Sequence, residues 1–415
     1  MATYITSGYA TAFTDAGLTK LNTADPQQGS WALSADGSLN WALIENFAYR
    51  SLHETTLFGK AAVEAFYGEA AEYSYYSGCS TGGRMGYFAA QNFPGDFDGI
   101  LAASPALNTP QVSPADFWPS VVMGNIAAPP QCVFNAYLKH IIDECDPLDG
   151  VTDGLISRPE RCNYNTSQLI GEIVNCSDTG GNFEISSEHA DVVSRIIDGA
   201  RTIDGQFLWF GVPPGAPFSG LANTTAIDGK IAPVPFYSAE AWIEYFVFRN
   251  TSFNPPDLAN LTFAQFDESF ATSVEVYTPM LGTEEPQLAS FHESGGKLLT
   301  WHGMADPYIA HNGTTLYWDR VQQDLGSSEV VDDFYRVFLA PGAGHCSGGY
   351  GPVPTDPLSA LVRWVERGEI PEMLSAEITV DNVAITRNLC PYPQALTYIG
   401  SGDVNDAASF TCTND

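Results

Sequence analysis

The chain has 415 residues, of which 44% are hydrophobic and 16% are charged, and its formal net charge at pH 7 is -32. This length and apolar content are sufficient for a large core, whereas the negative charge argues against binding to nucleic acids or anionic membranes, since both are polyanions. No apolar run approaches the roughly 20 residues that a membrane-spanning helix needs. We therefore expect a soluble protein that acts on small molecules or neutral polymers.

The N-terminal quarter alternates between strand and helix patterns. Residues 5–13 have the composition of a buried strand, and residues 45–68 carry apolar side chains at helical spacing and end at Gly68, a typical residue after a helix C-terminus. The next segments continue the alternation, with a strand at 71–80, a helix at 82–93 and a strand at 97–106. This order predicts an α/β architecture built on a parallel sheet.

The composition changes near Asn108. Pro, Gly, Asn and Ser become more frequent, and four cysteines lie between Cys132 and Cys176. We interpret residues 108–285 as an inserted lid domain of irregular loops held together by disulfides. The α/β pattern then returns, with a strand and loop at 295–309, a helix at 312–326, a strand at 333–346 and a helix at 356–368. Residues 1–107 and 286–415 would together form the catalytic domain.

A Gly-x-Ser-x-Gly motif at residues 78–82 lies between a predicted strand and a predicted helix. In the α/β-hydrolase fold such a motif forms a sharp turn that exposes a nucleophilic serine, with glycines where larger side chains would not fit. We therefore expect Ser80 to be a nucleophile and the Thr81 N–H to stabilise an oxyanion. The alternative is a glycine-rich turn without catalytic function.

Hydrolases of this kind place an acid and then a histidine after the serine. Asp306 follows a predicted strand in HGMADP, where the alternative is an Asp-Pro turn, and His345 lies in the glycine-rich loop after the last core strand. His302 and His311 lie near the acid but do not fit the expected order. We expect structural or surface roles for the other four histidines, which are His53, His140, His189 and His292.

Cysteines adjoin two of these candidates, because Cys79 precedes Ser80 and Cys346 follows His345. If the serine and histidine lie within hydrogen-bond reach, the two cysteines are close enough to form a disulfide, which would hold the base beside the nucleophile. Two separate thiols are the alternative. Cys145–Cys162 is the natural local bridge, Cys390–Cys412 would anchor the C-terminal tail, and Cys132 is left with Cys176 by elimination.

Two features indicate an oxidising, secretory environment. The eight cysteines are even in number and lack zinc-binding Cys-x-x-Cys spacing. Six N-glycosylation sequons also occur, at Asn165, Asn175, Asn223, Asn250, Asn260 and Asn312. The first residues lack the basic and apolar regions of a signal peptide. We therefore expect a secreted glycoprotein whose natural N-terminus is absent from this sequence.

Three carboxylates lie close together in the loop between Cys145 and Cys162. Asp146, Asp149 and Asp153 would repel one another without a cation or full hydration, and oxygen ligands without His or Cys suit Ca²⁺. A solvated acidic turn is an equal alternative on the residues alone. An EF-hand starting at Asp149 is disfavoured, because a valine occupies its third position.

The segments GCSTGGR, HGMADP and GAGHC together resemble the tannase and feruloyl esterase family of fungi and bacteria. The similarity continues through AYRSLHETTLFGKAAVEAFYG and FPGDFDGILAASPA and covers nearly the whole chain. It implies an α/β-hydrolase fold with an inserted lid, and a Ser80, Asp306, His345 triad with the disulfide beside it that is typical of the family. Leu18 stands where many members have histidine, and the second oxyanion donor is not located.

The resemblance also bears on metal binding. Members of the family carry a structural calcium ion in the lid, bound by aspartates in this pattern and by backbone oxygens. The matching positions here are Asp146, Asp149, Val151, Asp153 and Leu155. The resemblance therefore favours a structural calcium site over a solvated turn.

By the same resemblance, the activity would be hydrolysis of phenolic carboxylic esters, namely feruloyl or p-coumaroyl groups on plant cell-wall polysaccharides. Galloyl esters of tannins are an alternative substrate, and an inactive hydrolase that serves as a binding module is an alternative of another class. Four aromatic residues of the lid either stack on the substrate or belong to the core, and these are Phe117, Trp118, Trp209 and Phe210. No oligomeric state is predicted.

Overall fold

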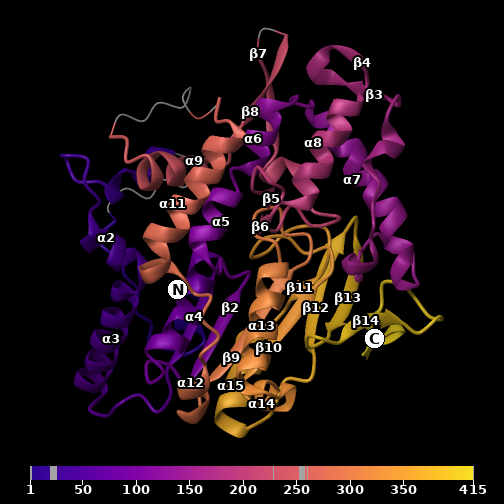
Figure 1. Cartoon of the computed structure of the whole chain (residues 1–415). Coiled ribbons are helices and arrows are strands. Elements are labelled where there is room, and N and C mark those ends of the chain that lie inside the picture. The colour runs from indigo at the N-terminus through magenta and orange to yellow at the C-terminus, as the bar shows by residue number, and fades with distance from the viewer. Residues whose placement is uncertain (1, 19–25, 228, 252–257, 259, 415) are drawn as a thin grey trace.

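The computed structural model describes residues 2–18, 26–227, 229–251, 258 and 260–414, and it is built around a four-stranded parallel sheet (Figure 1). The strand order is β1-β2-β9-β10. The bounds of these strands are β1 Tyr75–Cys79, β2 Gly99–Ala103, β9 Lys297–Gly303 and β10 Tyr335–Ala340. All three pairings are parallel, as the alternation of strands and helices predicts.

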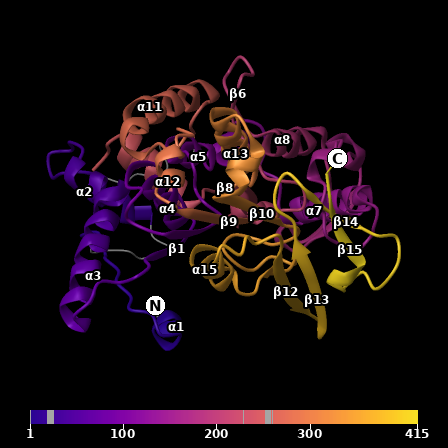
Figure 2. The same cartoon turned by 90° about the horizontal axis from the view of Figure 1, so that it is seen from below.

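Helices cover both faces of this sheet, because successive strand side chains point to opposite faces. On one face, Leu298 belongs to a cluster with residues of α4 (Thr81–Asn92) and α13 (Asn312–Leu325). On the other face, Leu299 packs in a cluster with Trp364 of α15 (Pro357–Arg367). Figure 2 shows α4 and α13 on one side of the strands and α15 on the other. The sheet is therefore an interior layer with a core on each side.

The predicted strand at 5–13 is wrong. The structure has a short helix, α1 (Ala2–Thr6), followed by residues without regular structure. Ile5 and Phe13 are exposed by 56% and 75% of their area. A strand obtains its hydrogen bonds from a neighbour, and this segment does not pair with β1; its contacts there include one hydrogen bond of 3.0 Å between the Tyr4 and Ser77 hydroxyls.

The predicted helix at 45–68 is present but divided. It consists of α2 (Trp41–Glu45), a π-helical turn at Asn46–Arg50 and α3 (Ser51–Tyr67). The helix ends at Gly68, whose φ of 82° is the left-handed conformation that favours glycine. Figure 1 shows α3 at the lower left edge of the molecule.

The lid is more regular than the sequence suggests. Its helices are α5 Thr109–Ala115, α6 Trp118–Asn125, α7 Gln131–Cys145, α8 Ser187–Asp198, α9 Tyr237–Ala241 and α11 Phe263–Leu281, and a π-helical turn (Trp242–Val247) follows α9. The described residues of the predicted lid also form three short hairpins: β3 Ile173–Cys176 with β4 Gly181–Glu184, β5 Ala200–Arg201 with β6 Phe207–Trp209, and β7 Asn223–Ile227 with β8 Lys230–Val234. The lid core also includes Ala32, Ile44 and Ala48, so the segment before α3 packs with the lid.

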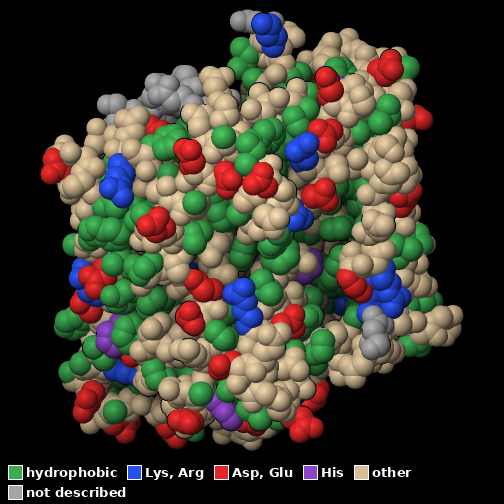
Figure 3. All heavy atoms as spheres, in the orientation of Figure 1, with side chains coloured by type: hydrophobic (Ala, Val, Ile, Leu, Met, Phe, Trp, Pro, Cys, Tyr) green, Lys and Arg blue, Asp and Glu red, His purple; other side chains and the backbone are tan. Residues whose placement is uncertain are grey.

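The remaining elements follow the lid in sequence. They are helices α12 Ala289–Glu293 and α14 Ser328–Asp332, the strand β11 Val353–Pro354, and two antiparallel pairs formed by β12 Leu374–Val380 with β13 Val383–Leu389 and by β14 Ala395–Tyr398 with β15 Phe410–Thr413. Among the helices that the structure describes, none is long and apolar enough to cross a membrane. On the face drawn in Figure 3, acidic side chains are scattered and outnumber basic ones, in keeping with the net charge of -32.

Candidate active site

The serine motif forms the turn between β1 and α4. Ser80 has φ 63° and ψ -125°, a conformation that non-glycine residues rarely adopt. The turn is held by two backbone hydrogen bonds, in which the Ser80 N–H donates to Ala103 and the Ala106 N–H donates to Ser80. Strain of this kind is a feature of functional sites. The local geometry is that of a nucleophile elbow.

The two glycines of the motif are not equally necessary. A Cβ atom at Gly78 would lie 2.5 Å from the Tyr76 hydroxyl and 2.6 Å from the Gly82 carbonyl oxygen, which is too close. A Cβ atom at Gly82 would make only a 3.4 Å contact with the Tyr76 hydroxyl. Lack of space therefore requires glycine at Gly78, as predicted, but it does not require glycine at Gly82.

Asp306 and His345 meet at the carboxyl ends of β9 and β10. The His345 Nδ1 atom lies 2.7 Å from Asp306 Oδ2, and the Asp306 side chain is fully buried, whereas that of His345 is 19% exposed. The other Asp306 oxygen accepts from the backbone N–H groups of Tyr308 and Ile309 at 2.9 and 3.0 Å. The carboxylate thus fixes the orientation of the imidazole, and the exposed part of the ring faces the cavity described below.

A second histidine on the same carboxylate was missed by the sequence analysis. His302 Nε2 lies 3.2 Å from Asp306 Oδ2, and His302 Nδ1 lies 2.8 Å from the Thr314 hydroxyl. Burial alone would raise the pKa of Asp306, but the hydrogen bonds from His302 and His345 outweigh it and hold that pKa well below its usual range. Asp306 is therefore ionised over the whole range of ordinary pH. A histidine four residues before a candidate acid was the available signal.

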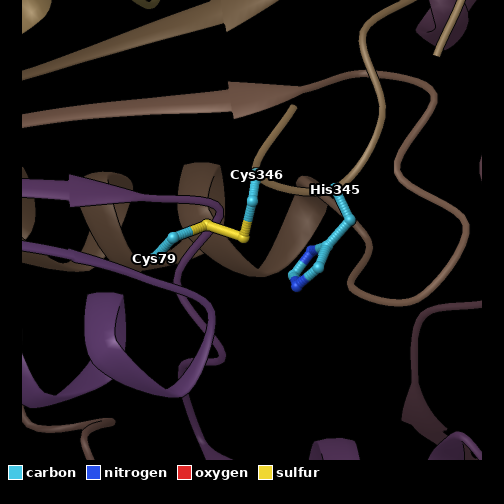
Figure 4. Close-up of side chains that lie close together, drawn as sticks. All are labelled: Cys79, His345 and Cys346. Atoms are coloured by element: carbon cyan, nitrogen blue, oxygen red, sulfur yellow. A yellow bond between two sulfur atoms is a disulfide. The ribbon is translucent and has the colours of Figure 1, made fainter. Parts of the chain in front are cut away.

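Ser80 and His345 are brought together by the disulfide between Cys79 and Cys346. These cysteines are 267 residues apart in sequence, and their Cα atoms are 5.8 Å apart. Figure 4 shows the His345 ring beside this bridge, and a ring nitrogen and the two sulfur atoms lie within 4.8 Å of one another. Both sulfurs are used in the disulfide, so this cluster is not a metal site.

Ser80, Thr81 and His345 all line one cavity of about 410 Å³. Among the described residues the Ser80 hydroxyl makes no hydrogen bond to His345, and such contacts often tighten only when substrate binds. The Thr81 N–H is the first of helix α4 and donates to no described residue, so it remains available to an anionic oxygen. The cavity therefore presents a hydroxyl, a base and a backbone donor together.

The walls of this cavity are rich in aromatic side chains, namely Trp31, Phe47, Phe236, Tyr237, Trp242, Phe246 and Tyr308. Sequence reasoning proposed other residues. Phe117 and Trp118 belong to the lid core, and Trp209 and Phe210 line a smaller cavity of about 10 Å³ that shares Asp116 and Tyr308 with the large one. The aromatic part of this wall thus comes from segments without a recognisable motif. Leu18, the departure from the family pattern, also lies in its wall.

The acidic loop of the lid lies apart from this cavity. Asp146 and Asp149 are only 2% and 7% exposed. Burial raises the pKa of Asp146 above its usual range and that of Asp149 to about 6. The third carboxylate, Asp153, pairs with the buried guanidinium of Arg387, which the sequence analysis did not foresee. Arg387 thus offsets the charge of one of the three carboxylates.

The two residues predicted to bind calcium through their backbone lie in the same loop. Val151 and Leu155 are 9% and 2% exposed, and their carbonyl oxygens accept no hydrogen bond from any described residue. Buried carbonyl groups without a donor are rare and energetically costly. Carbonyl and carboxylate oxygens without His or Cys ligands are the donor types that suit a hard divalent cation such as Ca²⁺. Each carboxylate also accepts backbone N–H groups, for example Asp149 from Ser157 at 3.0 Å.

All eight cysteines form disulfides, in the four pairs that the sequence suggested. Besides the bridge at the serine, the pairs are Cys132–Cys176, Cys145–Cys162 and Cys390–Cys412. The second of these closes the acidic loop. The third joins the end of β13 to β15 and so anchors the C-terminal tail.

Comparison with known proteins identifies the family. The sequence profile described as "Tannase and feruloyl esterase" matches residues 1–413. The chain belongs to the tannase and feruloyl esterase family. A relative named probable feruloyl esterase, from Arthroderma benhamiae, is 42% identical over 415 residues, which cover 98% of this chain and 75% of the relative. Feruloyl esterase B from Aspergillus niger is 31% identical over 398 residues, covering 90% and 72% of the two chains.

Solved structures of the family agree with the fold. Tannin acyl hydrolase from Aspergillus niger superposes with a TM-score of 0.86 at 27% identity, over 97% of this chain and 75% of the other. Feruloyl esterase B from Aspergillus oryzae gives a TM-score of 0.79 at 28% identity, over 92% and 76%. This tannase and feruloyl esterase family member therefore has the α/β-hydrolase fold, as predicted, and is a carboxylic ester hydrolase by family.

Proposed function

We propose that the protein is a serine esterase in which Ser80, His345 and Asp306 form the catalytic triad. Two contacts carry this proposal. The Asp306 carboxylate lies 2.7 Å from His345 Nδ1, and a disulfide joins Cys346, the residue after His345, to Cys79, the residue before Ser80. A hydroxyl nucleophile, a base and an acid that orients the base are the parts of this mechanism.

In the first step, Ser80 Oγ attacks the ester carbonyl carbon and its proton passes to His345 Nε2. Asp306 keeps the proton on His345 Nδ1, so that Nε2 is the free acceptor, and its negative charge stabilises the imidazolium that forms. The Thr81 N–H donates to the oxyanion of the tetrahedral intermediate. His345 gives the proton to the leaving alcohol. Water then attacks the acyl carbon, its proton passes to His345 Nε2 and on to Ser80 Oγ, and the acid is released.

The substrates that we propose are esters of phenolic acids, with feruloyl and p-coumaroyl esters of plant cell-wall polysaccharides ahead of galloyl esters. The support is the aromatic wall of the 410 Å³ cavity, a size suited to a small aromatic acid. Trp31, Trp242 and Phe246 offer faces and edges for ring packing. Galloyl esters remain the second candidate, because one of the similar solved structures is a tannin acyl hydrolase.

We also propose a structural calcium ion in the lid. Asp146, Asp149 and Asp153 would hold it with their carboxylates, and Val151 and Leu155 with their backbone oxygens. The support is the burial of these groups and the absence of hydrogen-bond donors for the two carbonyls within the described part of the chain. Calcium would supply positive charge that offsets carboxylate repulsion, and no catalytic step involves it.

Secretion and N-glycosylation are part of the same proposal. Four disulfides are typical of proteins from oxidising compartments. Of the six sequon asparagines, four are exposed, namely Asn165, Asn175, Asn223 and Asn260.

The test of the proposed function is turnover of methyl ferulate and methyl gallate by the wild type and by Ser80→Ala. We expect hydrolysis by the wild type and at least a 10³-fold loss in the variant, as for other serine hydrolases without their nucleophile. The ratio of the two rates identifies the acyl group. An active Ser80→Ala variant, or a folded, calcium-supplied wild type that is inert on both esters, would contradict the proposal and would favour an inactive binding module.

A further inference from the structure

One carboxyl group in the substrate cavity has no role in the mechanism above. Asp116 follows helix α5 and lines both the 410 Å³ cavity and the small cavity behind it. Its side chain forms no hydrogen bond or ion pair with any described residue. The residue is partly exposed, and its carboxyl oxygens are not among the fully buried atoms without partners. The free surface of this carboxyl therefore faces the cavity.

We propose that Asp116 is a substrate-binding residue whose carboxyl group forms hydrogen bonds with a hydroxyl group on the aromatic ring of the acid. This inference rests on the proposed function, because it assumes that the cavity beside Ser80 receives the ester. It adds a specificity determinant that neither the sequence motifs nor the triad geometry indicates.

The surroundings of Asp116 support this role. A polar group that is largely removed from water destabilises the fold when it has no hydrogen-bond partner. The unpaired carboxyl of the partly buried Asp116 therefore has no structural explanation. The neighbours that share the small cavity with it are mainly aromatic and aliphatic, including Trp209, Phe210, Val212 and Leu221. Asp306 and Tyr308 also line this cavity, and a few polar groups among mainly apolar walls are the usual arrangement for orienting a small ligand. Asp116 is therefore suited to binding one polar substituent of an otherwise apolar ring.

The protonation state of Asp116 is compatible with this contact. Burial, and secondarily the negative charge of Asp306, hold the pKa of Asp116 well above its usual range. The protonated carboxyl can donate through its O–H and accept through its carbonyl oxygen, so one phenolic hydroxyl can satisfy both. A neutral carboxyl also does not repel the oxyanion that forms at Ser80, or the carboxylate of the released acid.

The experiment compares two esters that differ in one hydroxyl group, methyl p-coumarate and methyl cinnamate. The ratio of their kcat/KM values is measured for the wild type, Asp116→Leu and Asp116→Asn. We expect the ratio to fall at least about 5-fold in Asp116→Leu, the size of one ordinary hydrogen bond. Asp116→Asn should retain most of the ratio, because the amide also donates and accepts. Asp143→Asn, which makes the same Asp-to-Asn change at an exposed position on α7, is the control for the substitution itself.

The outcomes separate this inference from the proposed function. If the wild type hydrolyses neither ester, nor methyl ferulate or methyl gallate, the proposed function itself fails. If the wild type is active but Asp116→Leu slows both esters equally, Asp116 acts on the Asp306 charge or on the fold, and the inference is overturned. A selectivity change seen only between methyl ferulate and a feruloyl arabinose ester would place the bound hydroxyl on the alcohol and would also overturn it. Thermal unfolding of each variant verifies that it is folded.

Discussion

Two disulfides in this protein each adjoin a group of ionisable side chains, and the two groups differ in how their charge is balanced. Cys79–Cys346 joins positions 267 residues apart beside Asp306 and His345, whereas Cys145–Cys162 joins positions 17 residues apart around three aspartates. Hydrogen bonds from histidines lower the pKa of Asp306, but burial raises that of Asp149 to about 6. Two buried aspartates thus have opposite shifts.

The difference shows what each group needs in order to be stable. The proposed triad contains both an acid and its partners, so folding brings these side chains together without a bound ion, and the distant disulfide holds them there. The loop between Cys145 and Cys162 brings three aspartates together, and Arg387 pairs with one of them, Asp153. The triad should therefore respond to changes in its own side chains, and the loop to the supply of calcium.

The largest expected effect is on catalysis through Asp306. Asp306→Asn keeps the shape of the side chain but removes the charge that holds His345 in the correct tautomer, so kcat should fall about 10⁴-fold. Ester hydrolysis under saturating substrate measures this loss. Asp149→Asn is the matched control in the lid, and its kcat in excess calcium should be close to that of the wild type. Equal losses of kcat in the two variants would contradict the separate roles proposed for Asp306 in catalysis and Asp149 in calcium binding.

The next effect is on stability through the two bridges. Removal of the distant bridge with Cys79→Ser and Cys346→Ser should lower the free energy of unfolding by about 5.5 kcal/mol, and removal of the local one with Cys145→Ser and Cys162→Ser by about 3 kcal/mol, because longer closed loops restrict the unfolded chain more. Denaturant titration measures both. Only loss of the distant bridge should also reduce kcat. An unchanged kcat after loss of the Cys79–Cys346 bridge would show that this disulfide does not hold His345 beside Ser80.

The smallest effect concerns calcium. Calcium at 100 times its dissociation constant should raise the free energy of unfolding by about 2.7 kcal/mol relative to chelator-treated protein. Asp149→Asn should lose most of this gain, since it removes one negatively charged ligand. Thermal unfolding in calcium and in chelator provides the comparison, with magnesium as the control ion. If calcium does not change the unfolding temperature of the wild type, the acidic loop is a solvated turn and the calcium proposal is wrong.

Much of the sheet could be predicted, because local signals define its elements. The glycines after α3, α13 and α15 adopt the left-handed conformation expected at helix ends, with φ values of 82°, 77° and 67°. The strand predicted at 5–13 does not form, because a strand needs a hydrogen-bonding partner, which the residues of the segment itself do not specify. The apolar composition of this segment therefore did not indicate its structure.

The site could be predicted only where a motif carried it. Ser80, Asp306 and His345 lie at fixed places relative to strands, so their positions followed from the fold pattern. The contact of His302 with Asp306 depends on the turn after β9, and the pairing of Arg387 with Asp153 spans 234 residues. Asp116 has no sequence signal at all, because its significance is the absence of a partner.

The most direct test of the central claim is covalent labelling with phenylmethylsulfonyl fluoride, followed by peptide mass spectrometry. The proposed triad predicts one adduct, on Ser80, formed in parallel with the loss of esterase activity and much more slowly in His345→Ala. Inactivation with the adduct on another residue, or full activity in protein labelled at Ser80, would contradict it.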